Sequence, residues 1–283
     1  MNKLLKILQE KADLEEIDLQ ELLRLYALEM LLSRLTHLPA SKELIVRGSL
    51  ITRFWAYPKH FRTVQDLDFV LDEPLNEIKG NKIIQDILKI EMDDLLKPLG
   101  GFQVTKIWEE TDLPALRFKI PVELCTHTFQ VQLDMAFNDP IVPPAVFREY
   151  TDLCGHKIWI RTILPELACA WKIHGLFEYW NKGNRWQAKT LYDIFLILDT
   201  QDVNKDFLKQ AIQVAFEDRK TPFEVYKRIL DGQFGQSKGT KKAWEKWRLS
   251  YGGKIPYLDY QPLLLKIRDF LDEIFIQLIA ESQ

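Results

Sequence analysis

An Asp-Leu-Asp at the start of a predicted strand is the feature that most constrains this chain. Residues 67–71 have the composition of a strand, and side chains two apart on a strand share a face. Asp66 and Asp68 therefore point the same way, opposite to the apolar positions that face the core. Neighbouring carboxylates repel each other, and a divalent cation removes that penalty. Because oxygen-only ligands favour Mg²⁺ or Mn²⁺, the pair predicts a metal site, with a solvated strand end as the alternative.

A Gly-Ser pair lies upstream of the two acids. Gly48 and Ser49 follow a strand predicted over residues 43–47, and the apolar residues 50–57 predict a short helix that Pro58 ends. Glycine lets the backbone approach a phosphate closely, and the serine hydroxyl and nearby amides can donate hydrogen bonds to it. The Gly-Ser turn therefore predicts a cradled triphosphate ahead of the Asp-x-Asp strand. It disfavours a metal-dependent nuclease.

The order of Gly-Ser, linking segment and Asp-x-Asp on a strand resembles that of nucleotidyltransferases of the polymerase-beta type, which hold a triphosphate and its metals in this way. The run Arg-Thr-x-x-Asp-Leu-Asp-Phe over residues 62–69 is similar, more narrowly, to the AbiEii/AbiGii toxin family, whose members carry Arg, Ser or Thr just before the acidic pair. The resemblance implies that four residues bind the nucleotide: Gly48, Ser49, Arg62 and Thr63. For Arg62, a surface position is the open alternative.

A third carboxylate is expected on a later strand. Residues 116–120 and 129–135 alternate apolar and polar positions, which indicates half-buried antiparallel strands. Asp134 lies on the polar face of the second segment, so all three acids converge if this strand neighbours the 67–71 strand. Polymerase-type sites use such a trio, in which the third acid binds the metal that activates the acceptor hydroxyl. The alternative is a strand-end aspartate that turns toward residues 138–140.

The second half of the chain is predicted to be helical, with helices over 164–180, 185–198 and 262–280. Lys172 is a lone cation in an apolar helix and therefore needs a partner or a function. A cation there can stabilise the charge that develops on the leaving group of a triphosphate. Lys189 and Asp193 are four positions apart and therefore share a helix face. The alternative to a functional role for these two residues is an ordinary ion pair on the helix surface.

That half carries a second resemblance to the toxin family. Leu-Pro-Glu-Leu-Ala-x-x-x-Lys at 164–172, followed by Lys-x-x-x-Asp-Ile at 189–194, is similar to the family's helical signature. There, a lysine on one helix and a basic residue with an aspartate on the next face the active site. The resemblance implies catalytic roles for Lys172 and Asp193, and nucleotide-binding roles for Lys172 and Lys189.

A basic, aromatic segment spans residues 219–254, where ten Lys and Arg stand against three Asp and Glu. Four aromatic residues are interleaved with or follow these charges: Trp244, Trp247, Tyr251 and Tyr257. Such a segment can follow an RNA backbone and stack bases, or it can be a solvated face over a tryptophan-rich core. Both interpretations stay open. Residues 238–242 are predicted to form a loop.

Composition limits the class of protein. At 283 residues, with 47% apolar and 28% charged residues, the chain has the composition of a soluble globular protein long enough for two domains. A net charge of −3 gives no global attraction to nucleic acid. The three cysteines, without Cys-x-x-Cys spacing, predict buried thiols rather than disulfides or zinc. No run of apolar residues approaches a membrane span, so we expect a cytoplasmic protein without a membrane partner.

The expected fold is α+β. A mixed, mostly antiparallel nucleotidyltransferase sheet with flanking helices, including 18–35 and 83–97, covers residues 1–160, and a helical domain over 161–283 completes the active-site cleft. The resemblance implies metal-dependent transfer of a nucleoside monophosphate from an NTP, with Mg²⁺ or Mn²⁺ and release of pyrophosphate. The resemblance further implies that this protein is the toxin of a toxin–antitoxin or phage-defence system and that it has a cognate antitoxin. RNA such as transfer RNA is the expected acceptor, ahead of protein. A non-catalytic nucleotide-binding or interaction protein is the alternative.

Overall fold

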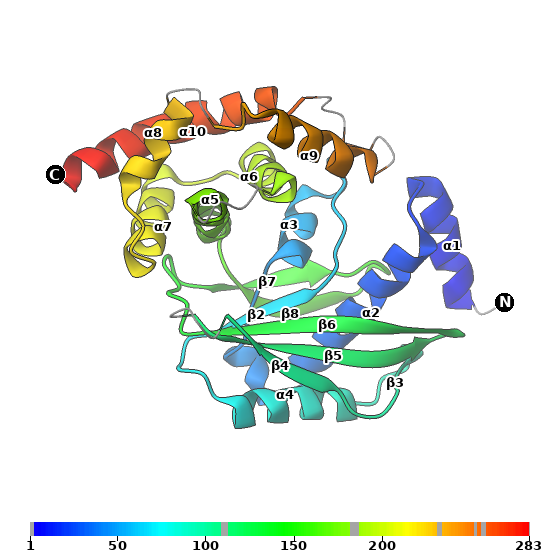
Figure 1. Ribbon diagram of the computed structural model, residues 1–283. Coiled ribbons are helices and arrows are strands. Elements are labelled where there is room, and N and C mark those ends of the chain that lie inside the picture. The colour runs from blue at the N-terminus through cyan, green and yellow to red at the C-terminus, as the bar shows by residue number, and fades with distance from the viewer. Residues whose placement is uncertain are drawn as a thin grey trace. The chain divides into compact units, whose positions relative to one another are not determined.

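The computed structural model describes residues 3–108, 113–181, 187–230, 234–251, 254–255 and 259–282. The chain divides into two compact units (Figure 1). The first comprises Met1–Phe54, Thr63–Asp139 and Ala145–Ile163, and the second comprises Trp55–Arg62, Pro140–Pro144 and Leu164–Gln283. Each unit is therefore assembled from segments that are separate in the sequence.

The first unit contains the sheet and most of the N-terminal helices. Its helices are α1 (Lys3–Glu15), α2 (Leu19–Thr36), the 3-10 helix η1 (Pro39–Lys42) and α4 (Glu77–Lys89), while α3 (Ser49–Ala56) runs into the second unit. Its strands are β1 (Ile45–Arg47), β2 (Leu67–Leu71), β3 (Leu96–Pro98), β4 (Gln103–Ile107), β5 (Ala115–Leu124), β6 (His127–Phe137), β7 (Val146–Thr151) and β8 (Lys157–Thr162).

These strands form one eight-stranded sheet in the order β3-β5-β6-β2-β1-β8-β7, with β4 also paired to β5. The pairs β2–β6 and β1–β8 are parallel, and the other pairs are antiparallel. The prediction of an α+β fold with a mixed, mostly antiparallel sheet is confirmed. The parallel pairing of β2 with β6 brings together two strands that stand far apart in the sequence.

One face of the sheet is buried under helices. Figure 1 shows α4 beneath the sheet, and at Gly80 of α4 an added Cβ would lie 2.8 Å from Leu116 Cδ1. Leu116, Phe118 and Met135 are fully buried and surround this glycine. Because side chains alternate along a strand, residues 117 and 134 must point to the opposite face. The apolar core therefore fixes which face carries the acids.

Two predicted elements differ from the structure. The helix expected over 83–97 begins earlier, at Glu77, where the Asn76 side chain caps it, and it ends at Lys89. Leu96 instead belongs to β3, where it pairs with β5. The loop expected over 238–242 is wrong, because these residues form the first turns of α9. Ser237 caps that helix by accepting a hydrogen bond from the Thr240 amide.

The second unit is helical. Its elements are α5 (Pro165–Asn181), α6 (Ala188–Thr200), α7 (Lys205–Asp218), the 3-10 helix η2 (Phe223–Tyr226), α8 (Lys227–Leu230), α9 (Lys238–Leu249) and α10 (Gln261–Glu281). Helix α5 packs on α6 and α7, and α10 packs on the same two helices. Phe216 of α7 contacts the rings of both Phe177 on α5 and Phe275 on α10. Aromatic packing therefore joins these three helices.

The described tryptophans of the basic segment contact other aromatic rings, and Trp244 is buried. Trp244 is 1% exposed. Trp247 contacts both Trp244 and Tyr192 of α6, with ring centroids 5.2 and 5.5 Å apart. Tyr257 lies outside the described residues. For Trp244, the structure favours the tryptophan-rich core over a base-stacking surface.

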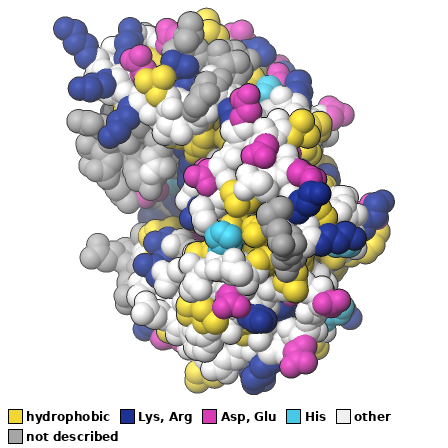
Figure 2. All heavy atoms as spheres, turned by 90° about the vertical axis from the view of Figure 1, so that its right-hand side faces the viewer, with side chains coloured by type: hydrophobic (Ala, Val, Ile, Leu, Met, Phe, Trp, Pro, Cys, Tyr) yellow, Lys and Arg dark blue, Asp and Glu magenta, His cyan; other side chains and the backbone are white. Residues whose placement is uncertain are grey.

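Charges of both signs mix on the molecular surface that Figure 2 shows. On this face, Lys and Arg side chains alternate with Asp and Glu, with hydrophobic side chains between them. This distribution agrees with the small net charge of −3. Within the described part of the chain, no helix is both long enough and apolar enough to cross a membrane.

Candidate functional site

The turn between β1 and α3 lies against the acidic strand β2. Gly48 has a φ of +78°, in the left-handed region that favours glycine, and Ser49 begins α3. A Cβ added at Gly48 would lie 1.9 Å from Oδ2 of Asp68 and 2.7 Å from its Cγ. Position 48 is therefore restricted to glycine twice, by its backbone conformation and by the carboxylate beside it.

Three carboxylates converge on the face of the sheet opposite to the one that α4 covers. Asp68 on β2 is directly opposite Asp134 on the neighbouring parallel strand β6, and Asp66 immediately precedes β2. One carboxylate oxygen from each of the three lies within 4.8 Å of the others. Asp134 is buried, and the other two are half-buried. The convergence of the three acids was expected if the strand of Asp134 neighbours that of Asp68, and β2 and β6 are neighbours.

The donor set fits a hard divalent cation. Three carboxylate oxygens at this spacing match the ligands that Mg²⁺ and Mn²⁺ prefer, and their three negative charges exceed the two positive charges of such a cation. Within the described ranges, this is the cluster of His, Cys, Asp or Glu that meets the spacing for a metal ligand set. The residues that would hold the cation are Asp66, Asp68 and Asp134.

Ser49 connects the turn to the acids. Its hydroxyl lies 3.3 Å from Oδ1 of Asp66, and its side chain is buried at the start of α3. The first amides of a helix have no intrahelical acceptor and attract an anion. Thr52 stabilises the turn, since both its amide and its hydroxyl donate to the Gly48 carbonyl at 3.1 Å. The turn therefore places anion-binding groups beside cation-binding groups.

Arg117 is a residue of the site that the sequence did not reveal. It lies directly opposite Asp134 in the β5–β6 pairing, and its Nε and Nη2 donate to the two carboxylate oxygens at 3.0 and 2.7 Å. This hydrogen bonding raises the pKa of Arg117, with the charges of Asp66 and Asp68 adding to the effect. Alternation over 116–120 did place Arg117 on the polar face. The pairing register that puts it beside Asp134 is not readable from the sequence.

A second cluster of predicted residues lies within the helical unit. Asp193 on α6 accepts hydrogen bonds from Nε and Nη2 of Arg62, at 2.6 and 3.1 Å, and from Nζ of Lys172 on α5, at 2.7 Å. The side chains of Asp193 and Arg62 are 1% and 3% exposed, and that of Lys172 is 19% exposed. The surface alternatives for Arg62 and for Asp193 are therefore wrong.

The charge of Asp193 is fixed by its two partners. Burial by itself raises the pKa of this carboxyl, but the charges of Arg62 and Lys172, and their hydrogen bonds, outweigh it and hold the pKa well below its ordinary value. Lys189, expected as the helical partner four residues earlier, is half-buried in the first turn of α6. The carboxylate oxygens instead bind Arg62 and Lys172.

Thr63, also predicted to bind the nucleotide, is 5% exposed and belongs to the sheet unit. Arg62, its neighbour in sequence, belongs to the helical unit. The chain therefore passes from one unit to the other between Arg62 and Thr63, three residues before Asp66.

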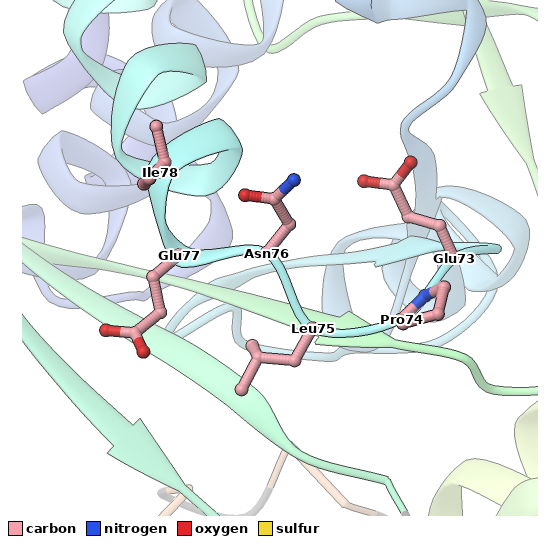
Figure 3. A pocket seen from close by; sticks show the side chains of 6 residues that line it. All are labelled: Glu73, Pro74, Leu75, Asn76, Glu77 and Ile78. Atoms are coloured by element: carbon pink, nitrogen blue, oxygen red, sulfur yellow. The ribbon is translucent and has the colours of Figure 1, made fainter.

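A separate hollow of about 460 Å³ follows β2 and is lined by residues 73–78 (Figure 3). Two of its acids already have cationic partners. Glu73 lies 2.9 Å from Nζ of Lys79, and Glu77 lies 2.6 Å from Nζ of Lys106. The lining comes from one short segment and does not include the acidic trio, so we place no site there.

Comparisons with known proteins agree with this geometry. A family model described as nucleotidyl transferase AbiEii toxin, type IV TA system, matches residues 31–272. The match spans both the sheet and the helical half, and it includes the acidic trio and the Arg62, Lys172 and Asp193 cluster. A comparison with curated proteins gives no match.

A solved structure shares the fold. A protein from H. pylori described as a candidate nucleotidyltransferase has a TM-score of 0.58 and 14% sequence identity to this chain, and the alignment covers 94% of this chain and 99% of that one. JHP933 from Helicobacter pylori has a TM-score of 0.49 and 13% identity, with 93% of this chain and 95% of that chain covered. At 14% identity, the likeness to the first of these structures is one of fold.

Proposed function

The chain belongs to the AbiEii nucleotidyl transferase toxin family of type IV toxin–antitoxin systems, and from that premise we propose that it transfers a nucleoside monophosphate from an NTP to an acceptor hydroxyl. The acceptor oxygen forms a bond to the α-phosphorus, and the bond from the α-phosphorus to the bridging oxygen of the β-phosphate breaks. Pyrophosphate leaves, and the hydroxyl proton passes to solvent. The convergence of three carboxylates within 4.8 Å is the observation that carries the proposal.

The acids have distinct roles in this reaction. We assign Asp66 and Asp68 to holding the divalent cation that accompanies the triphosphate, and Asp134 to the side of the acceptor hydroxyl. Mg²⁺ or Mn²⁺ held by these acids would neutralise phosphate charge and lower the pKa of the attacking hydroxyl. The presence of all three acids together with Lys172 supports transfer over a non-catalytic protein that retains the fold.

Gly48 and Ser49 bind the phosphates in this proposal. The glycine leaves room for close approach, and the first amides of α3 and the Ser49 hydroxyl can donate to phosphate oxygens. Thr63 and Lys189 remain predicted nucleotide contacts. The turn and the acids are adjacent, as the Ser49–Asp66 distance of 3.3 Å shows, so phosphate and cation would be bound together.

The helical cluster supplies positive charge. Lys172 keeps part of its side chain exposed while Asp193 holds its ammonium group, so we assign Lys172 to the charge that develops on pyrophosphate. A general base works best with a pKa near the working pH, and the pKa of Asp193 lies far below it. We therefore propose that Asp193 orients Lys172. In this proposal Arg62 holds Asp193 and does not contact the nucleotide.

For the acceptor we propose RNA, such as transfer RNA, and for the biological partner a cognate antitoxin. The type IV toxin–antitoxin description of the family supports the antitoxin. The proposal of an RNA acceptor comes from the resemblance of residues 62–69 and 164–194 to the toxin family. Protein is the other acceptor that the experiment below distinguishes.

The test is incubation of the purified chain with each α-labelled NTP, in the presence of total RNA or total protein. Reactions contain Mg²⁺, Mn²⁺ or EDTA, and Asp66→Asn is compared with Asp72→Asn. Asp72 lies just beyond β2 and is exposed, so the control removes the same charge outside the trio. We expect labelled RNA with divalent cation, loss of labelling in EDTA and in Asp66→Asn, and retention of labelling in Asp72→Asn.

Three results would contradict parts of the proposal. Labelling that persists in EDTA or in Asp66→Asn would exclude the metal site. If only protein is labelled, the acceptor is protein rather than RNA. Binding of NTP without transfer to either pool would return the chain to the class of nucleotide-binding proteins.

A further inference from the structure

Arg117 belongs to a row of charged residues that crosses four strands. In the sheet register, Arg117 on β5 faces Asp134 on β6, Asp134 faces Asp68 on β2, and Asp68 faces Arg47 on β1. Directly opposed residues share a face of the sheet, so two anions stand side by side between two cations. Arg47 donates a hydrogen bond to Asp139 at 2.9 Å, whereas Arg117 donates to a metal-binding acid of the row itself.

The Arg117 guanidinium uses both oxygens of Asp134. Its two hydrogen bonds, at 3.0 and 2.7 Å, form the bidentate pairing that arginine makes with carboxylates. Gln132 donates a third hydrogen bond to Oδ2 of Asp134 at 3.3 Å. A divalent cation that takes Asp134 as a ligand needs one of these oxygens and brings two positive charges close to the guanidinium.

We propose that Arg117 is the internal counter-ion of the metal site: it neutralises Asp134 when no divalent cation is bound, and it must withdraw from that carboxylate when one binds. The inference rests on the metal site of the proposed function. Its consequence is that the metal affinity of the free protein is lower than three carboxylates alone would give. The charge of an incoming triphosphate then favours metal loading, because it offsets the retained charge of Arg117.

The exposure of the two partners supports a movement of the arginine rather than of the acid. The Arg117 side chain is 33% exposed and the Asp134 side chain is 7% exposed. A long, partly solvated guanidinium can rotate into water at little desolvation cost, whereas Asp134 is held by its buried strand. Lys119 lies two residues on along β5, on the same face and exposed, and faces Gln132 instead of an acid.

The test measures Mn²⁺ binding to the full chain without nucleotide, by electron paramagnetic resonance of free Mn²⁺. Arg117→Gln removes the counter-ion, Lys119→Gln removes an equal charge from the same strand face, and Asp134→Asn removes a ligand. We expect Arg117→Gln to bind Mn²⁺ about tenfold more tightly, the scale of losing a like charge a few ångströms from the cation. Lys119→Gln should stay within about twofold of the parent.

A second measurement uses the unmutated chain and so does not depend on the folding of Arg117→Gln. The Nε–H resonance of Arg117, assigned by its absence in Arg117→Lys, reports the hydrogen bond to Asp134. Saturating Mg²⁺ should remove the protection of this proton from exchange with water. Unchanged protection, or Mn²⁺ binding by Arg117→Gln that is equal to or weaker than that of the parent, would overturn the inference.

The outcome for Asp134→Asn separates this inference from the proposed function. If Asp134→Asn binds Mn²⁺ as well as the parent does, the proposed metal site is itself wrong, and the counter-ion inference falls with it. If Asp134→Asn weakens binding and Arg117→Gln does not strengthen it, only the counter-ion inference fails.

Discussion

Replacing Gly48 by alanine tests whether the turn before α3 is built around the carboxylate of Asp68. The backbone of Gly48 has a φ of +78°, and the new methyl group would lie 1.9 Å from Oδ2 and 2.9 Å from Cβ of Asp68. Real Cβ atoms do not approach other atoms this closely. The variant must therefore move either the turn or the metal-binding carboxylate.

Gly100 offers a matched control, since it separates backbone strain from the steric clash. Its φ is +90°, and an added Cβ meets nothing within 4 Å. Alanine in the left-handed region costs roughly 1–2 kcal/mol, and both variants carry that cost. The clash adds roughly 1–3 kcal/mol at position 48 alone, on the scale of overpacking a filled site. We expect Gly48→Ala to lose about 2–5 kcal/mol and Gly100→Ala about 1–2 kcal/mol of unfolding free energy.

Urea unfolding measures these free energies, and Mn²⁺ titration measures the effect on the site. A displaced Asp68 should weaken Mn²⁺ binding by about tenfold or more in Gly48→Ala, and Gly100→Ala should bind as the parent does. The reasoning is refuted if the two variants are equally stable and both retain the parent's Mn²⁺ affinity. That result would mean that the turn relaxes without disturbing the carboxylate.

Two further predictions concern buried acids. Asp193→Ala leaves Arg62 and Lys172 without the carboxylate between them, so we expect the unfolding free energy measured in urea to fall by about 3–5 kcal/mol. The exposed Asp202→Ala should lose less than about 0.5 kcal/mol. A loss below about 1 kcal/mol in Asp193→Ala would contradict the buried pairing. Burial raises the pKa of Glu29 from 4.5 to about 7, although its two hydrogen bonds lower it. The unfolded chain therefore loses this proton first as pH rises through 4.5–7, and unfolding free energy should fall by about 3 kcal/mol across that window. Urea unfolding of Glu29→Gln at pH 5 and pH 8 should lack this decrease, and an equal pH dependence in both proteins would count against it.

Two elements that differ from their prediction show where the local sequence pattern stops being informative. The helix predicted over 83–97 includes Leu96 because this residue fits a helical spacing, yet the backbone of Leu96 pairs with β5. The loop predicted over 238–242 forms the start of α9, because Ser237 caps it and the buried Trp244 anchors it. In both places a partner elsewhere in the chain, or a single cap, outweighs the local composition.

What the sequence by itself determined is the local chemistry of the site. The two-residue period of a strand put Asp66 and Asp68 on one face, and alternation over 129–135 put Asp134 on a polar face. The Gly-Ser pair indicated a turn, and the apolar setting of Lys172 indicated that this lysine needs a partner or a function. Each of these inferences needs only neighbouring residues, which is why they can be drawn from the sequence.

Only the tertiary structure decided which of these groups meet. The pairing of β2 with β6 joins Asp68 to Asp134, and the β5–β6 register adds Arg117. The contact of Arg62 with Asp193 spans 131 positions of the chain. Strand order, register and helix packing are set by burial of apolar surface across the whole unit, and a one-residue change of register would turn every side chain of a strand to the other face. No local pattern encodes that choice, so the partners of the charged groups follow from the fold.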